Sequence, residues 1–278
     1  MPRVHDRNDT IDKQEINQMK KYVKVLLVCF IVCALLTGCT GNTRAQDILY
    51  QVSTLDALMQ GVYDGELTLE ELLQHGDFGI GTFDALDGEM VILDGTVYQV
   101  LSSGEVVQPD LSVTTPFAMI TQFNTDIQSD VSSVSDYNKL QETIGSLLPS
   151  QNEIYAIEIH GTFSYIEARS VPSQTEPYPL LSEVTEEQTV FEYKDVTGTL
   201  VGYWCPEYLS GINLAGYHLH FLSEDYTMGG HLLECSIENA AISINTVTQF
   251  QMLIPQNEYF LQTDFGDVTE QEKQNVEQ

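Results

Sequence analysis

The feature that most constrains the fold is a series of short, strand-like segments separated by glycine-containing turns. In "MVILDGTVYQVLSSGEVV", residues 90–107, runs rich in β-branched and aromatic residues are separated by Asp94-Gly95 and Ser103-Gly104. Aspartate and glycine tolerate the positive φ angles of tight turns, so such dipeptides favour antiparallel hairpins. The pattern therefore predicts an antiparallel sheet.

Three later segments also have strand-like composition. We expect "EIYAIEIHGTFSYIEARSV" to form a strand pair broken near Gly161, and "TVFEYKDVTGTLVGYWC" to form a hairpin that turns at 196–198. The third segment, "AAISINTVTQFQMLIP", is predicted to be strand throughout. Strands therefore dominate the chain.

Helices are predicted mainly in the first half of the chain, from apolar residues at helical spacing. The second of them has Thr68 as its expected N-cap and Glu71 three residues later, which is typical of a capping box. The predicted helical segments are 47–63, 67–74, 135–148 and 182–188.

The fold class that follows is α+β, with mixed or antiparallel β-sheets and a few helices in two closely packed β-rich halves. A proline-containing stretch, 172–179, is the best internal boundary in the sequence. We therefore expect an N-terminal α+β half at 47–171 and a C-terminal β-rich half at 180–266, followed by a tail at 267–278.

The N-terminal segment is predicted to be a signal peptide, 1–38, of the lipoprotein type. "MKKYVKVLLVCFIVCALLTGC" begins at Met19 with three lysines in its basic region, continues with an apolar stretch, and ends at Cys39 in a sequence that resembles the bacterial lipobox. Residues 39–46 would then be a tether. We expect export and lipid anchoring at Cys39 on the outer face of the cytoplasmic membrane. The alternatives are an uncleaved N-terminal anchor and a cytoplasmic protein.

The charge balance excludes one class of partner. The formal net charge is −30, and the residues after position 38 include 37 acidic and only five basic side chains. Such a chain repels phosphate backbones, so we expect no nucleic-acid partner. The two cysteines after the tether, Cys205 and Cys235, are expected to be small buried hydrophobic residues.

Three histidines form a candidate metal site in "GYHLHFLSEDYTMGGHLLECSI". In a strand, His218 and His220 point to one face, and a turn over 223–230 would return His231 close to them. Three histidine ligands with open positions suit a catalytic zinc ion. Two alternatives remain: half-buried hairpin histidines without metal, and a cupin-like site that uses Glu224.

Arg169 and Glu89 are the candidate residues for binding and catalysis. Arg169 is the only arginine after the tether, and a guanidinium can grip a substrate carboxylate through two hydrogen bonds; a structural salt bridge is the alternative. Glu89 lies at a turn-to-strand edge, where a carboxylate can serve as general acid or base. Residue chemistry alone does not separate it from Asp84, Asp87 and Asp94.

These clusters together resemble the α-acetolactate decarboxylase family over nearly the whole chain after the tether. The resemblance is carried by "HGDFGIGTF…LDGE", "GTFSYIEARSV" and "GYHLHFLSED…GGH". It implies a zinc ion held by the three histidines, a catalytic arginine at Arg169, and further catalytic residues at Glu89, Thr82 and Glu277, the last on a tail that folds back to the metal.

The resemblance also implies a reaction: zinc-dependent decarboxylation of (S)-2-acetolactate to (R)-acetoin and CO2, without an organic cofactor. The alternatives are an exported, non-catalytic lipoprotein that binds a metal or a small anion, and a metal-dependent hydrolase or cupin-like metalloenzyme. Beyond its small-molecule substrate, the chain could form a homodimer through an extended sheet.

Overall fold

The computed structural model describes residues 18, 21, 47–266 and 268–277. Apart from residues 18 and 21, the predicted signal peptide lies outside these residues, as does the whole predicted tether, 39–46, with Cys39. The described residues from 47 onward cluster into one compact unit. Among the described residues, no helix is both long enough and apolar enough to cross a membrane.

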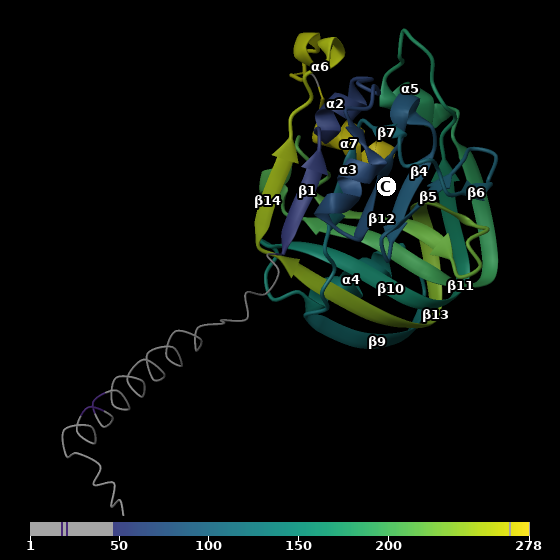
Figure 1. The fold of residues 1–278 in the computed structure, drawn as a ribbon. Coiled ribbons are helices and arrows are strands. Elements are labelled where there is room, and N and C mark those ends of the chain that lie inside the picture. The colour runs from purple at the N-terminus through teal and green to yellow at the C-terminus, as the bar shows by residue number, and fades with distance from the viewer. Residues whose placement is uncertain (1–17, 19–20, 22–46, 267, 278) are drawn as a thin grey trace, which may run out of the picture. The chain divides into compact units, whose positions relative to one another are not determined.

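Two large sheets pack face to face in this unit (Figure 1). The first has seven strands in the order β14-β1-β8-β3-β4-β5-β6, antiparallel except for the β1–β14 pair. Its strands are β1 (Ile48–Val52), β3 (Phe78–Thr82), β4 (Glu89–Leu93), β5 (Thr96–Val100), β6 (Val106–Val107), β8 (Ala118–Thr121) and β14 (Gln249–Leu253).

The second sheet has five strands in the order β10-β11-β12-β13-β9, and β10 also pairs with β13. A separate small sheet joins β2 (Leu67–Thr68) to β7 (Thr114–Thr115). The strands of the second sheet are β9 (Ile127–Val134), β10 (Ile154–Ser170), β11 (Thr189–Cys205), β12 (Gly216–Ser223) and β13 (Gly229–Val247). Because β9 and β10 precede residue 171 and β14 follows residue 180, the two sheets do not correspond to the two sequence halves.

Helices cover the outer faces of the sheets and one end of the space between them. The α-helices are α2 (Leu55–Met59), α3 (Leu69–Leu72), α4 (Tyr137–Leu147), α5 (Leu181–Glu186), α6 (Glu258–Gln262) and α7 (Glu270–Glu277). The described part of the chain also has three 3₁₀ turns: η1 (Leu73–His75), η2 (Asp84–Leu86) and η3 (Glu207–Leu209). The mixed α+β class with mostly antiparallel sheet is thus confirmed.

The hydrophobic core has three layers because strand side chains alternate between the two faces of a sheet. The layer between the sheets includes Phe78 and Val91 from the first sheet and Tyr203 from the second. A second layer lies under α4, where Leu140 and Ile144 contact the outer face of the second sheet. The third lies under α3 on the outer face of the first sheet. Side chains from both sheets therefore line the space between them.

The capping box predicted for the second helix is confirmed. The Thr68 hydroxyl accepts a hydrogen bond from Glu71 N, and the Glu71 carboxylate accepts one from Thr68 N, at the start of α3. The helices predicted near 135–148 and 182–188 form α4 and α5. The Asp94-Gly95 turn joins β4 to β5, with φ of 50° and 73° at its two residues.

The helix predicted at 47–63 is wrong over its first half. Residues 48–52 form β1, which is hydrogen-bonded on both sides, to β14 and β8. A strand buried on both faces has a nearly continuous apolar run, so its apolar positions also fit a helical spacing. Ser53, with φ of 60°, ends the strand, and Thr54 caps the short helix α2.

The two breaks predicted at glycines are also wrong, since β10 and β11 are continuous strands of 17 residues each. Gly161 and Gly198 are register partners in the middle of this pair. A Cβ atom at Gly161 would collide with the carbonyl of Asn239 on the neighbouring strand, and one at Gly198 would collide with that of Leu222. These glycines allow close approach of the strands rather than a turn.

Candidate metal centre and active-site cavity

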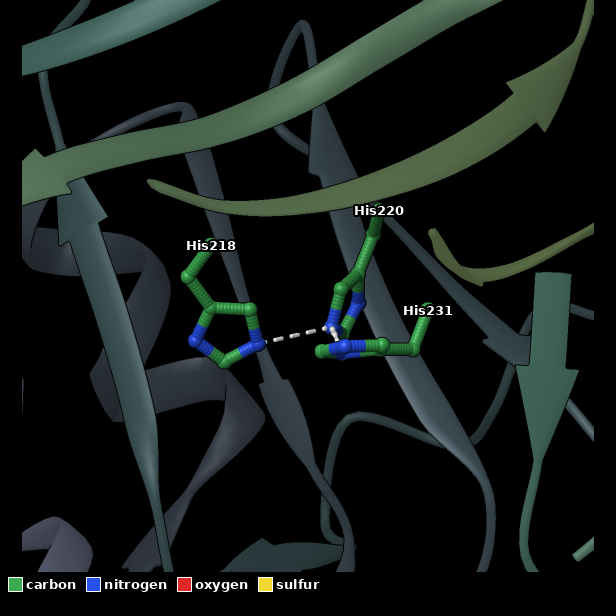
Figure 2. A group of neighbouring side chains, drawn as sticks. All are labelled: His218, His220 and His231. Carbon is green, nitrogen blue, oxygen red and sulfur yellow. Dashed lines mark hydrogen bonds between the residues drawn. The ribbon is translucent and has the colours of Figure 1, made fainter. Parts of the chain in front are cut away.

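The predicted histidine hairpin forms as expected. His218 and His220 lie on β12, and His231 lies on β13 as the direct register partner of His220. Figure 2 shows the three imidazole rings converging on one point from these two strands. All three side chains are buried, and their ligand atoms lie within 4.8 Å of one another. The hairpin therefore brings together three nitrogen donors.

The spacing of the nitrogens suits a metal ion. His218 Nε2 lies 3.2 Å from His220 Nε2, which lies 3.3 Å from His231 Nδ1. Nitrogen atoms bound to one tetrahedral zinc ion at about 2.0–2.1 Å are themselves about 3.3 Å apart. The three residues fit a single metal ion in both donor type and spacing.

The protonation of His220 also favours metal binding. Its Nδ1 lies 2.8 Å from the carbonyl oxygen of Met90, which can only accept a hydrogen bond, so Nδ1 carries the proton. Nε2 then has a lone pair directed at the other two rings. Burial lowers the pKa of His220 well below its ordinary value, and burial together with Arg169 lowers the pKa of His218 to about 3. Both rings are therefore neutral and able to bind metal at neutral pH.

Arg169 lies beside the histidines because β10 pairs with β13. It is the register partner of His231, its side chain is only 4% exposed, and its Nη1 donates a hydrogen bond to Gln188 Oε1 at 3.0 Å. Gly230, with φ of 139°, lets β13 approach closely: a Cβ atom there would lie 2.5 Å from the Arg169 carbonyl oxygen. The guanidinium is thus held at the edge of the three-histidine site.

The first sheet supplies Glu89 and Thr82 from the opposite side. The two residues are register partners on β4 and β3, and Glu89 Oε2 lies 3.6 Å from His220 Nε2. The Thr82 hydroxyl donates a 2.7 Å hydrogen bond to the carbonyl of Gly88, whose φ of 85° forms the turn into β4. Thr82 therefore ties down the turn that precedes Glu89.

One cavity collects these side chains. Its polar lining consists of Thr82, Glu89, Arg169, Thr185 and the three histidines. Its apolar wall is formed by Leu58, Leu86, Phe117, Val171 and Leu181, and Gly81 completes the lining. Sites of this kind bind small molecules because apolar walls exclude water while a few polar groups fix orientation.

The structure separates Glu89 from the other acidic residues of its cluster. Asp84 is exposed and accepts a hydrogen bond from Gly65 N, and Asp87 accepts one from Gln99. Glu224, the residue that a cupin-like site would use, is exposed in the β12–β13 turn and does not line the cavity. Glu277 ends helix α7, and its side chain lies outside what the structure describes.

The residue-based reasoning missed Gln188, Thr185 and the Met90 carbonyl. Thr185 lies in α5 and Gln188 lies just after it. The sequence presents this segment only as a short acidic helix. A backbone carbonyl carries no side-chain signal at all. Each of these groups reaches the site through tertiary packing, so nothing in its local sequence could have identified it.

The fold and the cavity define a class of protein: an α+β protein with a buried three-histidine site that can hold a metal ion. The family model described as alpha-acetolactate decarboxylase matches residues 49–267. The chain belongs to the alpha-acetolactate decarboxylase family.

Individual relatives are similar in sequence to this chain over most of its length. The alpha-acetolactate decarboxylase of Methanosarcina mazei is 42% identical over 236 residues, which cover 85% of this chain and 82% of the relative. That of Methylococcus capsulatus is 44% identical over 218 residues, covering 78% and 84%. The crystal structure of alpha-acetolactate decarboxylase from Bacillus subtilis strain 168 matches with a TM-score of 0.81 at 34% identity, covering 83% of this chain and 99% of that one.

Proposed function

We propose that this protein decarboxylates (S)-2-acetolactate to (R)-acetoin and CO2 with a zinc ion held by His218, His220 and His231. The observation that carries the proposal is the convergence of three buried imidazoles, a buried guanidinium and a buried carboxylate on one small cavity. The names of the two relatives from Methanosarcina mazei and Methylococcus capsulatus, both alpha-acetolactate decarboxylases, support the substrate.

Arg169 would bind the substrate through its carboxylate. The substrate is a small anion with a carboxylate, a tertiary hydroxyl and a ketone on adjacent carbons. A guanidinium can donate two parallel hydrogen bonds to one carboxylate. This interaction is stronger where water is excluded. The hydrogen bond to Gln188 holds the guanidinium in place, so little ordering is required when the substrate binds.

The chemical step breaks the bond between the tertiary carbon and the carboxylate. The electron pair of that bond moves toward the ketone oxygen as CO2 leaves, and the carbon that lost CO2 then takes up a proton. A bound zinc ion would supply Lewis acidity for the ketone and hydroxyl oxygens next to that bond. Glu89 is the proton donor we propose, because its carboxyl group faces the cavity beside His220.

The donor set favours zinc among the divalent metals. Three imidazole nitrogens with an open position are the ligands of a catalytic zinc site, whereas magnesium and calcium prefer oxygen ligands. The Met90 carbonyl supplies the outer hydrogen bond that such a histidine ligand typically has.

The net charge of the chain opposes the approach of an anion. The formal charge is −30, but distant charges are screened beyond about 8 Å at physiological ionic strength. Arg169 and a bound divalent ion act at contact distance. The local field in the cavity therefore favours the substrate even though the surface as a whole repels it.

Two other functions have less support. A cupin-like site would need Glu224, which is exposed in a turn. A non-catalytic binding protein would not need the Glu89 carboxylate placed 3.6 Å from His220 of the three-histidine site.

We also propose that the protein is exported and anchored by a lipid on Cys39. The support is the basic and apolar N-terminal sequence that ends in Leu36-Thr37-Gly38-Cys39. Palmitate labelling of cells that express the full chain tests this. The wild type should incorporate label and the Cys39→Ala variant should not; equal labelling of both would refute the proposal.

The catalytic proposal is tested by incubating the purified protein with (S)-2-acetolactate and analysing the product by chiral chromatography. We expect (R)-acetoin with one CO2 released per molecule, and a severe loss of rate in Glu89→Gln. Racemic acetoin formed at the uncatalysed rate would reject the proposal.

A further inference from the structure

Helix α7, near the C-terminus, is a defined structural element. Thr269 and Glu272 form a capping box at its start: the Thr269 hydroxyl accepts a hydrogen bond from Glu272 N, and the Glu272 carboxylate accepts one from Thr269 N at 2.8 Å. Val276, in the next turn, is buried in the core layer between the sheets. The capping box therefore fixes the start of the helix, and Val276 attaches its last turn to the core.

This helix forms one wall of a depression that shares lining residues with the cavity. Glu272 and Val276 line the depression together with Arg169 and Thr185, and both Arg169 and Thr185 also line the histidine cavity. The depression and the cavity thus meet at the guanidinium proposed to bind the substrate. α7 therefore lines a depression that borders the proposed anion site.

A buried ion pair ties α7 to the rest of this end of the molecule. Lys273 Nζ lies 2.7 Å from Asp56 Oδ1, and the lysine side chain is only 2% exposed. A lysine held this far from water needs a negative partner, because an isolated buried charge is strongly unfavourable. The pair therefore specifies where α7 can pack.

The partner of this lysine belongs to a helix that itself lines the cavity. Asp56 lies in the first turn of α2, and Leu58 of the same helix contributes to the cavity wall. Helix α5 packs against both α2 and α7, and it supplies Leu181 and Thr185 to the wall. In Figure 1, α2, α5 and α7 lie together at the same end of the space between the sheets.

We propose that α7 is the wall that closes the substrate entrance and that the Lys273–Asp56 pair is the positioning contact that holds it there. The inference rests on the proposed function for its substrate, but the position of the helix does not depend on it. Lys273 and Asp56 act through the placement of α7, not by touching the substrate.

Asp56→Asn is the decisive variant because it removes the negative charge that lies 2.7 Å from Lys273 Nζ, at nearly unchanged side-chain size. We expect α7 to leave its place and expose Lys273. Trypsin would then cut after Lys273 and release residues 274–278, QNVEQ, which mass spectrometry can quantify. The wild type should release this peptide at least about 10-fold more slowly, since a lysine buried in packed structure is protected.

Two further measurements separate positioning from simple stabilisation. For Asp56→Asn, kcat/KM for acetolactate should fall about 10-fold or more at unchanged metal content per folded chain. The rate at which a chelator withdraws the bound metal ion should rise. The matched control is Lys139→Met, which removes the exposed Lys139–Glu142 pair on α4 and should change none of the three readouts.

Each outcome decides the proposal. Faster peptide release together with lower kcat/KM supports it. Wild-type release, or faster release with wild-type kcat/KM, overturns it. If Asp56→Asn does not fold, Lys273→Ala removes the pair without leaving a buried cation, and the same fall in kcat/KM and faster metal withdrawal are expected. If even the wild type makes no acetoin, the proposed function fails, while peptide release and metal withdrawal still judge the position of α7.

Discussion

Arg169 on β10 and His231 on β13 are direct register partners, although 61 residues separate them in the sequence. His231 is in turn the register partner of His220 on β12. Three neighbouring strands therefore present a guanidinium and two imidazoles in one row. The catalytic geometry that we propose follows from strand register, so substitutions that disturb register should affect the metal site and the anion site together.

Replacing Arg169 should abolish most of the activity while the metal stays bound. Arg169→Ala removes the group proposed to grip the substrate carboxylate, and we expect kcat/KM to fall by at least about 100-fold, as for a lost charged hydrogen bond of about 3 kcal/mol. Steady-state kinetics and elemental analysis of the same preparation measure both effects. Near-normal kcat/KM would remove the arginine from the mechanism.

Replacing a histidine of the triad should remove the metal. His218→Ala leaves two imidazoles, which hold a divalent ion much more weakly than three do. We expect less than stoichiometric metal after dialysis, measured by elemental analysis. His75→Ala is the matched control, because that histidine stacks on Tyr50 away from the cavity and should leave metal content unchanged. Stoichiometric metal retained by His218→Ala would refute the ligand assignment.

The metal-free protein should lose stability as the pH falls below about 6.5. Burial and Arg169 lower the pKa of His218 to about 3, so the folded state keeps this ring neutral while the unfolded chain protonates it. Because the unfolded state then binds more protons, the free energy of unfolding decreases as the pH falls.

For one such histidine the loss is about 1 kcal/mol between pH 6.5 and 5.5. Urea unfolding of metal-free wild type and His218→Asn at both pH values isolates this contribution from that of the many carboxylates. The wild type should lose more stability than the variant over this interval. An equal loss in both proteins would contradict the effect assigned to burial.

Gly230 should be intolerant of a side chain. Its φ of 139° is rarely adopted by other residues, and a Cβ atom would lie 2.5 Å from the Arg169 carbonyl oxygen. We expect Gly230→Ala to destabilise the fold by about 1–3 kcal/mol and to weaken metal binding by displacing His231. Thermal unfolding and metal titration measure the two effects.

Gly145 provides the comparison for that substitution. It lies inside α4, where a Cβ atom would meet only the Tyr217 hydroxyl at an ordinary 3.5 Å. Gly145→Ala should therefore stabilise the protein by about 0.5–1 kcal/mol. A Gly230→Ala variant as stable as Gly145→Ala would show that the close approach of β13 to β10 is not required.

Local sequence patterns predicted the elements whose conformation is set by neighbouring residues and is kept in the tertiary structure. The Asp94-Gly95 turn and the Thr68–Glu71 capping box depend on residues within one turn, and both are present in the structure. The errors at Gly161 and Gly198 have a different origin, since glycine that permits a turn also permits two strands to approach. Only the register of β10 against β11 and β13 distinguishes these cases.

The candidate site could be predicted where its residues have distinctive chemistry. The histidine hairpin followed from strand alternation and one turn, while Arg169 and Glu89 were selected by residue type and by resemblance to a family. The two sheets place Glu89 opposite His220. This placement could not be derived from local sequence, because the two residues are 131 positions apart in the chain. The resemblance implied that the tail folds back to the metal, but the helical form of α7 and its buried lysine were not anticipated, since a polar tail gives no local sign of its packing contacts.

The most direct measurement of zinc-dependent decarboxylation is a titration of the metal-free protein with zinc, with acetoin formation from acetolactate followed at each addition. The rate should rise from near zero in proportion to zinc and saturate at about one ion per chain, since three histidines converge on one site. Full activity without metal, or no acetoin after zinc has bound, would contradict the account.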